Sequence, residues 1–283
     1  MLALSLGIAA AFAWALHDLL VRKLAQGAAL LPMMLTVLAA GSVALLAPAL
    51  IWADWGTVSL AGLGVSALAG FAYALGMGGL YRALSVAPVR LVAPILGAYP
   101  MLSLGIAALQ GRAIAPLEWA AVAAIVLGIA VVAVTGREET AGSGPVLPAL
   151  LWAGLGAVGF ASTFALGQEA ARLMGDLPAT LTARLVTLGL IAVLALALRA
   201  PLLPPRGQRG TLAAMGVLDA LALGLVLASG SLPHPEYAAV ASALFGVLTI
   251  LLAWRLLAES VRPVQWAGIA TVFAGIAVLS VQG

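Results

Sequence analysis

The sequence contains no cysteine and only two histidines, His17 and His234. Without cysteine the chain cannot form a disulfide framework, a thiolate nucleophile or a cysteine-ligated metal site. Two histidines are too few for an all-protein zinc site unless carboxylates complete it. We therefore expect no metal site, no cofactor and no catalytic residues.

Charge is also scarce. Charged residues make up 8% of the 283 residues and hydrophobic residues 64%, whereas a soluble domain carries about 25% charged residues. The net charge is only +3, and the basic residues are scattered singly between apolar runs, which excludes a phosphate-binding surface for nucleic acid. Apolar runs of roughly 20 residues, enough to cross a bilayer, recur along the chain. The sequence predicts an integral membrane protein whose partner is the lipid bilayer.

Glycine, proline and charged residues divide the chain into ten apolar segments. Each segment should be a helix, because backbone groups in lipid must find their hydrogen-bond partners within the segment. No stretch shows the alternation of a barrel strand. The expected helices cover residues 2–21, 30–52, 58–82, 86–109, 116–135, 147–168, 178–199, 211–231, 236–257 and 263–281.

One of these segments occurs twice in the sequence, in two similar copies. Residues 116–134 read PLEWAAVAAIVLGIAVVAV and residues 263–281 read PVQWAGIATVFAGIAVLSV, with nine of nineteen positions identical at an offset of 147. The offset spans five helices, an odd number, so the second copy enters the membrane from the opposite side. This predicts an all-α protein of ten transmembrane helices, built as two inverted five-helix repeats around a central cavity. The halves are residues 1–135 and 147–283, joined by a linker at 136–146.

Inverted repeats are typical of secondary transporters, whose sites lie near the midplane between the halves. The alternative is a duplication retained only for packing. The repeated helix itself carries small residues four positions apart, which allow close helix approach, so we expect it to be structural. The two small-residue stripes are Ala120, Ala124 and Gly128, and 147 positions later Ala267, Thr271 and Gly275.

Several local motifs resemble a known family. They are FAWALHDLLVRK in the first helix, LGAYPML in the fourth, RLVTLGL in the seventh, and LLAES at the end of the ninth, just before PVQWAGI. With ten helices in two inverted halves, the chain resembles the EamA branch of the drug/metabolite transporter superfamily, most closely its YddG-type exporters of aromatic amino acids. The small multidrug exporters of that superfamily carry a mid-membrane glutamate in helix one, where this chain has Trp14. This departure leaves facilitated export open beside proton-coupled export.

The resemblance implies that helices one, three, four, six, eight and nine line the cavity. Aromatic and polar side chains recur there at helical spacing, as in Trp14 with His17 and in Tyr73, Met77 and Tyr81. Stacking faces with a few hydroxyl groups suit a planar amphipathic solute, although such a stripe also suits an ordinary core. The predicted substrate-binding residues are Trp14, His17, Tyr73, Met77, Tyr81, Tyr99, Phe160, Phe164, Ser242 and Phe245.

Two further charges fall inside apolar segments, Arg184 and Asp219. An ionisable side chain near mid-depth costs roughly 2.5–3.5 kcal/mol on insertion scales, so it faces the bundle interior. We expect Arg184 to pair with a carboxylate or a helix end. Whether Asp219 faces the cavity stays open at this stage.

The expected function is export of small amphipathic metabolites, aromatic amino acids first, by alternating access across the bacterial inner membrane. The partners would be a small-molecule substrate and lipid, with no nucleic acid, in a monomer or weak homodimer. The alternative is a multidrug or other metabolite exporter of the same superfamily. A membrane-embedded enzyme would need a nucleophile beside a base, and neither His17 nor His234 has a serine at suitable spacing.

Two arguments about the orientation of the chain in the membrane disagree. Lysine and arginine gather in the loops that follow odd-numbered helices, and the positive-inside rule then places both termini outside. The family resemblance implies cytoplasmic termini, and we adopt that expectation. Both arguments place the two termini on one side of the membrane.

Overall fold

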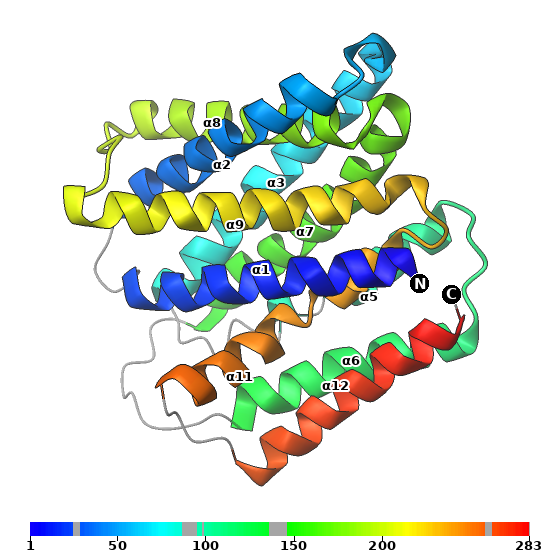
Figure 1. The fold of residues 1–283 in the computed structure, drawn as a ribbon. Helices are drawn as coiled ribbons and strands as arrows, with labels where there is room; N and C mark the ends of the chain where they lie inside the picture. Colours follow the sequence, from blue (N-terminus) through cyan, green and yellow to red (C-terminus); the bar gives the residue numbers. More distant parts are fainter. Residues whose placement is uncertain (25–28, 87–94, 98, 136–145, 258–261, 283) are drawn as a thin grey trace.

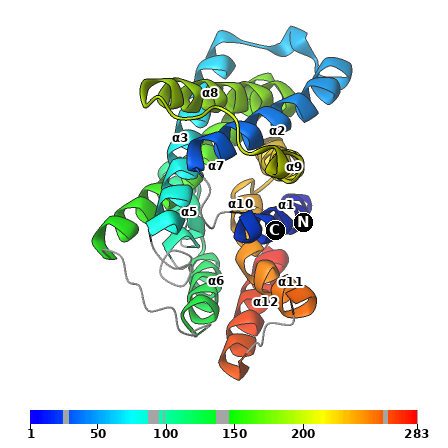
Figure 2. The same cartoon turned by 90° about the vertical axis from the view of Figure 1, so that its left-hand side faces the viewer.

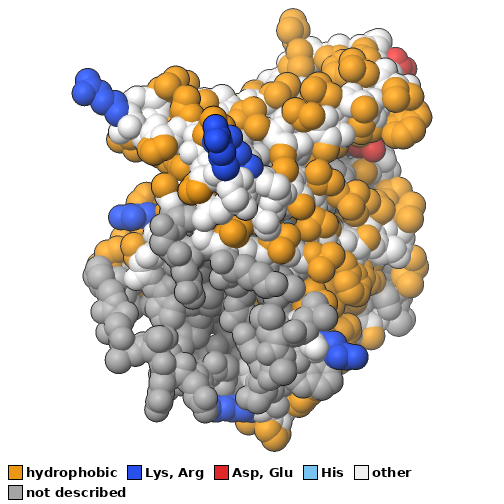
Figure 3. Space-filling model, turned by 60° about the vertical axis from the view of Figure 1, so that its left-hand side comes forward, with side chains coloured by type: hydrophobic (Ala, Val, Ile, Leu, Met, Phe, Trp, Pro, Cys, Tyr) orange, Lys and Arg blue, Asp and Glu red, His pale blue; other side chains and the backbone are white. Residues whose placement is uncertain are grey.

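The computed structural model describes residues 1–24, 29–86, 95–97, 99–135, 146–257 and 262–282. Within those ranges every regular element is a helix. Five helices are long and apolar enough to cross a membrane, and shorter apolar helices accompany them. Large apolar side chains such as Trp52, Leu60 and Val193 are exposed, and Figure 3 shows apolar side chains spread over one face with few charges among them. The chain is therefore a multi-pass membrane protein.

The helices of the first half match the expected segments. They are α1 (Leu2–Leu24), α2 (Leu30–Trp52), α3 (Leu60–Val86), α5 (Tyr99–Leu109) and α6 (Pro116–Thr135), with a short 3₁₀ turn, η1 (Trp55–Thr57), before α3. The fourth expected segment, 86–109, is described only from residue 95 onward and without residue 98; the rest of it lies outside the described residues.

The second half repeats this order with similar bounds. Its helices are α7 (Val146–Met174), α8 (Asp176–Ala197), α9 (Arg209–Ala228), α10 (Glu236–Ser242), α11 (Phe245–Leu257) and α12 (Pro263–Gln282), with 3₁₀ turns η2 (Arg206–Gln208) and η3 (Ser229–Ser231) on either side of α9. Helix α12 begins 147 positions after α6 begins, the offset seen in the sequence.

One segment that we expected to be a single helix is two helices in the structure. Segment 236–257 is divided into α10 and α11. At the junction the amides of Ala243 and Leu244 bond to the carbonyls of Val240 and Ala241, three residues back instead of four. This tightening to 3₁₀ geometry ends α10 and re-aims α11.

The helices form two groups with a pair between them. Figure 1 and Figure 2 show α2 and α8 together at one edge, α6 and α12 together at the opposite edge, and α1 beside α9 between them. Helices α3 and α7 pack along each other behind this layer. The start of α1 and the end of α12 lie at the same end of the bundle.

Helices α6 and α12 meet through mirrored contacts. A Cβ atom added to Gly128 would come within 2.6 Å of Val272 Cγ2, and one added to Gly275 within 2.7 Å of Ile125 Cγ1. Because 128 and 275, and 125 and 272, are each 147 apart, the two contacts are equivalent under exchange of the helices. The expected close packing is present at Gly128 and Gly275. The rest of each stripe was misplaced: Ala120, Ala267 and Thr271 are exposed, and the other small residues buried at this contact are Ala121 and Gly268.

The first turns of the two helices are also built alike. Glu118 Oε2 accepts from the Ala115 amide at 2.7 Å, and Gln265 Oε1 accepts from the Arg262 amide at 2.8 Å. Each is an N3 side chain that reaches back to the residue before the helix and satisfies an otherwise unbonded amide. These positions too are 147 apart.

Candidate functional site

A hollow lined by described residues lies between helices of both halves of the chain. Helices α1, α3 and α5 contribute to its wall from the first half, and α7, α9 and α11 from the second. Its lining is mainly aromatic and aliphatic, with one carboxylate and one imidazole. The lining residues are Trp14, His17, Tyr73, Met77, Leu80, Tyr81, Leu96, Tyr99, Phe160, Phe164, Asp219 and Phe245.

Close approach of α3 and α7 shapes one wall. A Cβ atom on Gly76 would come within 2.9 Å of the Phe160 ring, so only glycine leaves room for that ring. On α3, Tyr73 and Met77 are four residues apart and share a face, as Phe160 and Phe164 do on α7. The Tyr73 and Phe160 ring centroids lie 6.2 Å apart.

Phe164 is the centre of the aromatic cluster. Its ring centroid lies 5.7 Å from Trp14, 5.5 Å from Tyr99 and 6.5 Å from Phe160. Trp14 in turn packs edge-on against Phe245 at 6.5 Å. These are the tilted, edge-to-face and stacked arrangements that aromatic rings prefer, and they offer an inserted planar solute several ring faces.

Asp219 provides the main polar group of the cavity. Its carboxylate accepts from the Tyr73 hydroxyl at 2.6 and 2.7 Å, from Arg184 Nη1 at 2.6 Å and from Trp14 Nε1 at 3.1 Å. Asp219 is 4% exposed and Arg184 is fully buried. A buried carboxylate with a bonded guanidinium stays ionised, because each charge offsets the other's cost of leaving water. The expected pairing of Arg184 with a carboxylate is present.

Asp219 and its three donors lie on four different helices. Tyr73 lies on α3, Trp14 on α1, Arg184 on α8 and Asp219 itself on α9. The network therefore joins the two halves at the wall of the cavity. Arg184 Nη2 lies 3.4 Å from the Val37 carbonyl oxygen on α2.

The structure brings nine of the ten predicted binding residues to one cavity wall. The tenth, Ser242, stands just behind it: its Oγ lies 2.8 Å from the Tyr99 hydroxyl and donates to the Ala239 carbonyl. Leu80, Leu96 and Asp219 also line the wall and were absent from the predicted set. The two leucines carry no sequence signal that separates them from core residues, whereas Asp219 was visible as a charge inside an apolar segment.

A second, smaller hollow lies on the other side of Phe164, between α5, α7 and α10. It is more polar, with Ser103, Gln110, Gln168, Arg172 and Glu236 among its lining residues. Gln168 Nε2 donates to Ser229 Oγ at 2.9 Å and to the Pro235 carbonyl at 2.8 Å. The Phe164 ring thus separates an aromatic chamber from a polar one.

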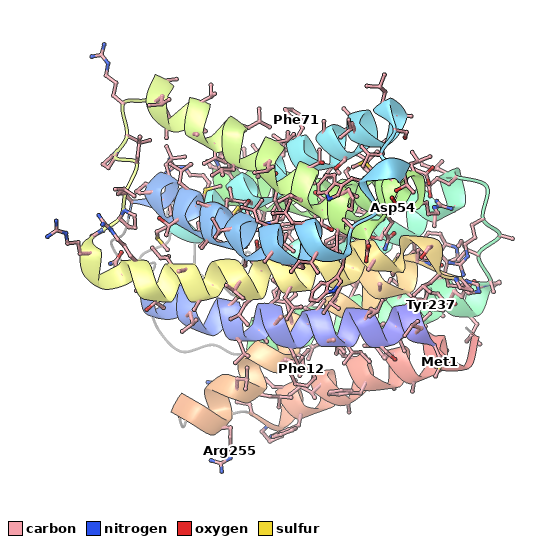
Figure 4. All side chains as sticks on the ribbon, turned by 45° about the horizontal axis from the view of Figure 1, so that its top comes forward. Met1, Phe12, Asp54, Phe71, Tyr237 and Arg255 are labelled. Atoms are coloured by element: carbon pink, nitrogen blue, oxygen red, sulfur yellow. The ribbon has the colours of Figure 1, made fainter. Side chains whose placement is uncertain are left out.

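A charged cluster, which we call the Arg112 cluster, ties the first half to the second near that polar hollow. It contains Arg112, Glu118, His234, Glu236 and Tyr237. Arg112 Nη2 and the Tyr237 hydroxyl both bond Glu118 Oε1, at 2.7 and 2.6 Å. Arg112 also forms an ion pair with Glu236 and lies 5.2 Å from the Tyr237 ring centre. Figure 4 shows Tyr237 at the end of the bundle where Met1 lies, with Arg255 at the opposite end.

Three members of the Arg112 cluster could in principle hold a cation. Glu118, His234 and Glu236 offer ligand atoms within 4.8 Å of one another. The Arg112 guanidinium already bonds both carboxylates and supplies the opposing charge. The cluster therefore fits an ion-pair link between α5, α6 and α10 better than a metal centre.

His234 lies in the turn before α10, outside the apolar helices. Its ring stacks on Tyr237 at 5.0 Å. Partial burial, reinforced by the Arg112 guanidinium, holds the pKa of His234 below its ordinary value of 6.5. Protonation of His234 therefore works against the folded state.

Comparison with known proteins shows a family similarity for part of the chain. Residues 147–281 match the EamA-like transporter family, and a comparison with curated proteins gave no match. A crystal structure of another protein is 20% identical and covers 99% of this chain and 96% of its own, with a TM-score of 0.81. At that identity the likeness shows the fold alone. Over residues 147–281 the chain is therefore similar to EamA-like transporters.

Proposed function

We propose that the protein is a secondary transporter that exports small amphipathic metabolites across the bacterial inner membrane, with aromatic amino acids as its main substrates. The observation that carries this proposal is the aromatic cavity itself, walled by helices of both halves and holding one ionised carboxylate. A transported ring would stack on Phe164 and its neighbours, and the polar head would meet Asp219 and the hydroxyl groups.

Alternating access follows from the proposed symmetry. Ten transmembrane helices in two inverted halves, residues 1–135 and 147–283, would have two equivalent packings that open the cavity to opposite sides. The mirrored contacts of α6 with α12 support this division. In this arrangement α6 and α12 are a stable frame, while α1, α3, α7 and α9 rock around the cavity.

Counterflow in proteoliposomes tests this function. Vesicles preloaded with unlabelled phenylalanine and diluted into labelled phenylalanine should accumulate label transiently, because an alternating carrier exchanges solute without net driving force. Labelled tryptophan should behave alike, and labelled glutamate should not accumulate. Accumulation of hydrophobic drugs alone would favour the multidrug alternative. Failure of every aromatic solute, drug and metabolite to exchange would contradict transport by this cavity.

A further inference from the structure

The described wall of the cavity carries a negatively charged side chain but no lysine or arginine. Asp219 faces it, while the guanidinium of Arg184 bonds that carboxylate but does not belong to the cavity lining. Among the described lining residues there is no lysine or arginine. On the described wall a solute therefore meets the carboxylate of Asp219, while its own carboxylate meets no lysine or arginine there.

The Asp219 carboxylate also has bonding capacity to spare. Trp14, Tyr73 and Arg184 donate to it, and Tyr73 shares its one hydroxyl hydrogen between both oxygens. Three hydrogens therefore serve about four acceptor sites. The Trp14 bond to Oδ1 is the longest at 3.1 Å, so Oδ1 is the oxygen that can best share a further donor. The ring of Trp14, whose Nε1 donates to this oxygen, lies 5.7 Å from the ring of Phe164.

From these two features we propose that Asp219 recognises the ammonium group of the substrate, and that the cavity selects aromatic ammonium compounds over aromatic carboxylates. The proposal rests on the proposed transport function and names the headgroup that it carries. Arg184 keeps Asp219 ionised when the cavity is empty, and Tyr73 and Trp14 hold the carboxylate in position. The solute ring stacks on Phe164 while its ammonium group donates to Oδ1. A cation beside an aromatic wall gains further from the ring faces.

Competition for labelled phenylalanine on the purified protein in detergent tests this directly, and it avoids the passive membrane permeation of amines. Phenylalaninamide and 2-phenylethylamine keep the ammonium group, and 3-phenylpropionate keeps only the carboxylate. We expect the two amines to displace phenylalanine within about threefold of its own concentration. The acid should need at least about tenfold more, because a charge-assisted hydrogen bond is lost.

Asp219→Asn then assigns the preference to one residue. We expect its amine-to-acid ratio to fall to within about threefold of unity, while Asp176→Asn, the same change at the exposed start of α8, keeps the wild-type ratio. An unchanged ratio in Asp219→Asn would overturn the assignment. If that variant does not fold, the wild-type series still decides, since an acid that competes as well as the amines contradicts the proposal. Binding without ammonium preference defeats only this inference, whereas no binding by any aromatic solute defeats the proposed function as well.

Discussion

Arg184 contacts the residue at its own repeat position: its Nη2 lies 3.4 Å from the carbonyl oxygen of Val37, 147 residues earlier. In a two-fold arrangement, equivalent positions can touch only at the axis. The Arg184–Asp219 pair therefore lies where the proposed two-fold axis passes, at the wall of the cavity. Because the partner position is valine, the charge is present in one half only, and the cavity is chemically asymmetric although its frame is mirrored.

The mirrored frame predicts a matched pair of stability effects. Gly128→Ala and Gly275→Ala should each lower the melting temperature, because the new Cβ would press on the carbonyl oxygens of Gly268 and Ala121 at 2.7 and 2.8 Å. Overpacking of this kind costs about 1–3 kcal/mol. Gly154→Ala, in α7 with nothing within 4 Å of the new atom, is the control and should melt no lower than wild type. Equal behaviour of all three would contradict the mirrored interface.

The proposed topology predicts where reporters appear. Reporters fused to the two termini should report the same compartment, because an even number of spans separates them. A reporter at position 142, in the predicted linker after five spans, should report the opposite one. A signal at position 142 from the same side as the termini would refute the division into five plus five.

The sequence predicted the pairing of α6 with α12 better than it predicted the packing of single residues. The repeat was visible because nine positions of the α6 and α12 sequences are identical at offset 147. Gly128 and Gly275 were placed correctly, but the other stripe positions were not, since alanine occurs on several faces of both helices and small size alone does not select one. The break between α10 and α11 has no proline to announce it. Only the local hydrogen bonds reveal it.

The candidate site was accessible to the same reasoning for a different reason. Helical spacing, together with the helices that the family resemblance implies, gave Tyr73, Met77, Phe160 and Phe164 as wall residues. The central position of Asp219 could not be derived, because its donors Trp14, Tyr73 and Arg184 come from three other helices and no local spacing connects them.

The aromatic cluster predicts an affinity change. Phe164→Ala should raise the apparent KM for phenylalanine roughly two- to twelvefold. The lost ring stacking contributes about 0.5–1.5 kcal/mol to binding, in addition to the contribution of the buried apolar surface. Phe273→Ala, on the exposed face of α12, is the matched control and should transport normally. Uptake at equal reconstituted amounts checks both, and a normal KM in Phe164→Ala would remove the ring from the site.

His234 predicts a pH dependence of stability. Its folded pKa lies below 6.5, so the unfolded chain binds more protons than the folded one as pH falls below that value. The contribution of His234 to stability is complete above pH 6.5 and is lost as the solution is acidified. His234→Asn suits the left-handed backbone at this position (φ 56°) and cannot titrate. The fall in melting temperature from pH 7.5 to 5.5 should be smaller in the variant, since Arg112, Glu118 and Glu236 are present in both proteins. Identical falls would contradict the assignment.

The absence of native cysteine makes the central claim directly measurable, because a single introduced cysteine can be modified without background. Met77→Cys places a thiol on the cavity wall, and Asp176→Cys places one outside it. Labelled phenylalanine uptake by proteoliposomes is measured before and after treatment with a charged thiol reagent. The account predicts that modification blocks uptake by Met77→Cys, that phenylalanine protects against the block, and that modified Asp176→Cys transports normally. Uptake that continues unchanged with Met77→Cys fully modified would contradict a transport path through this cavity.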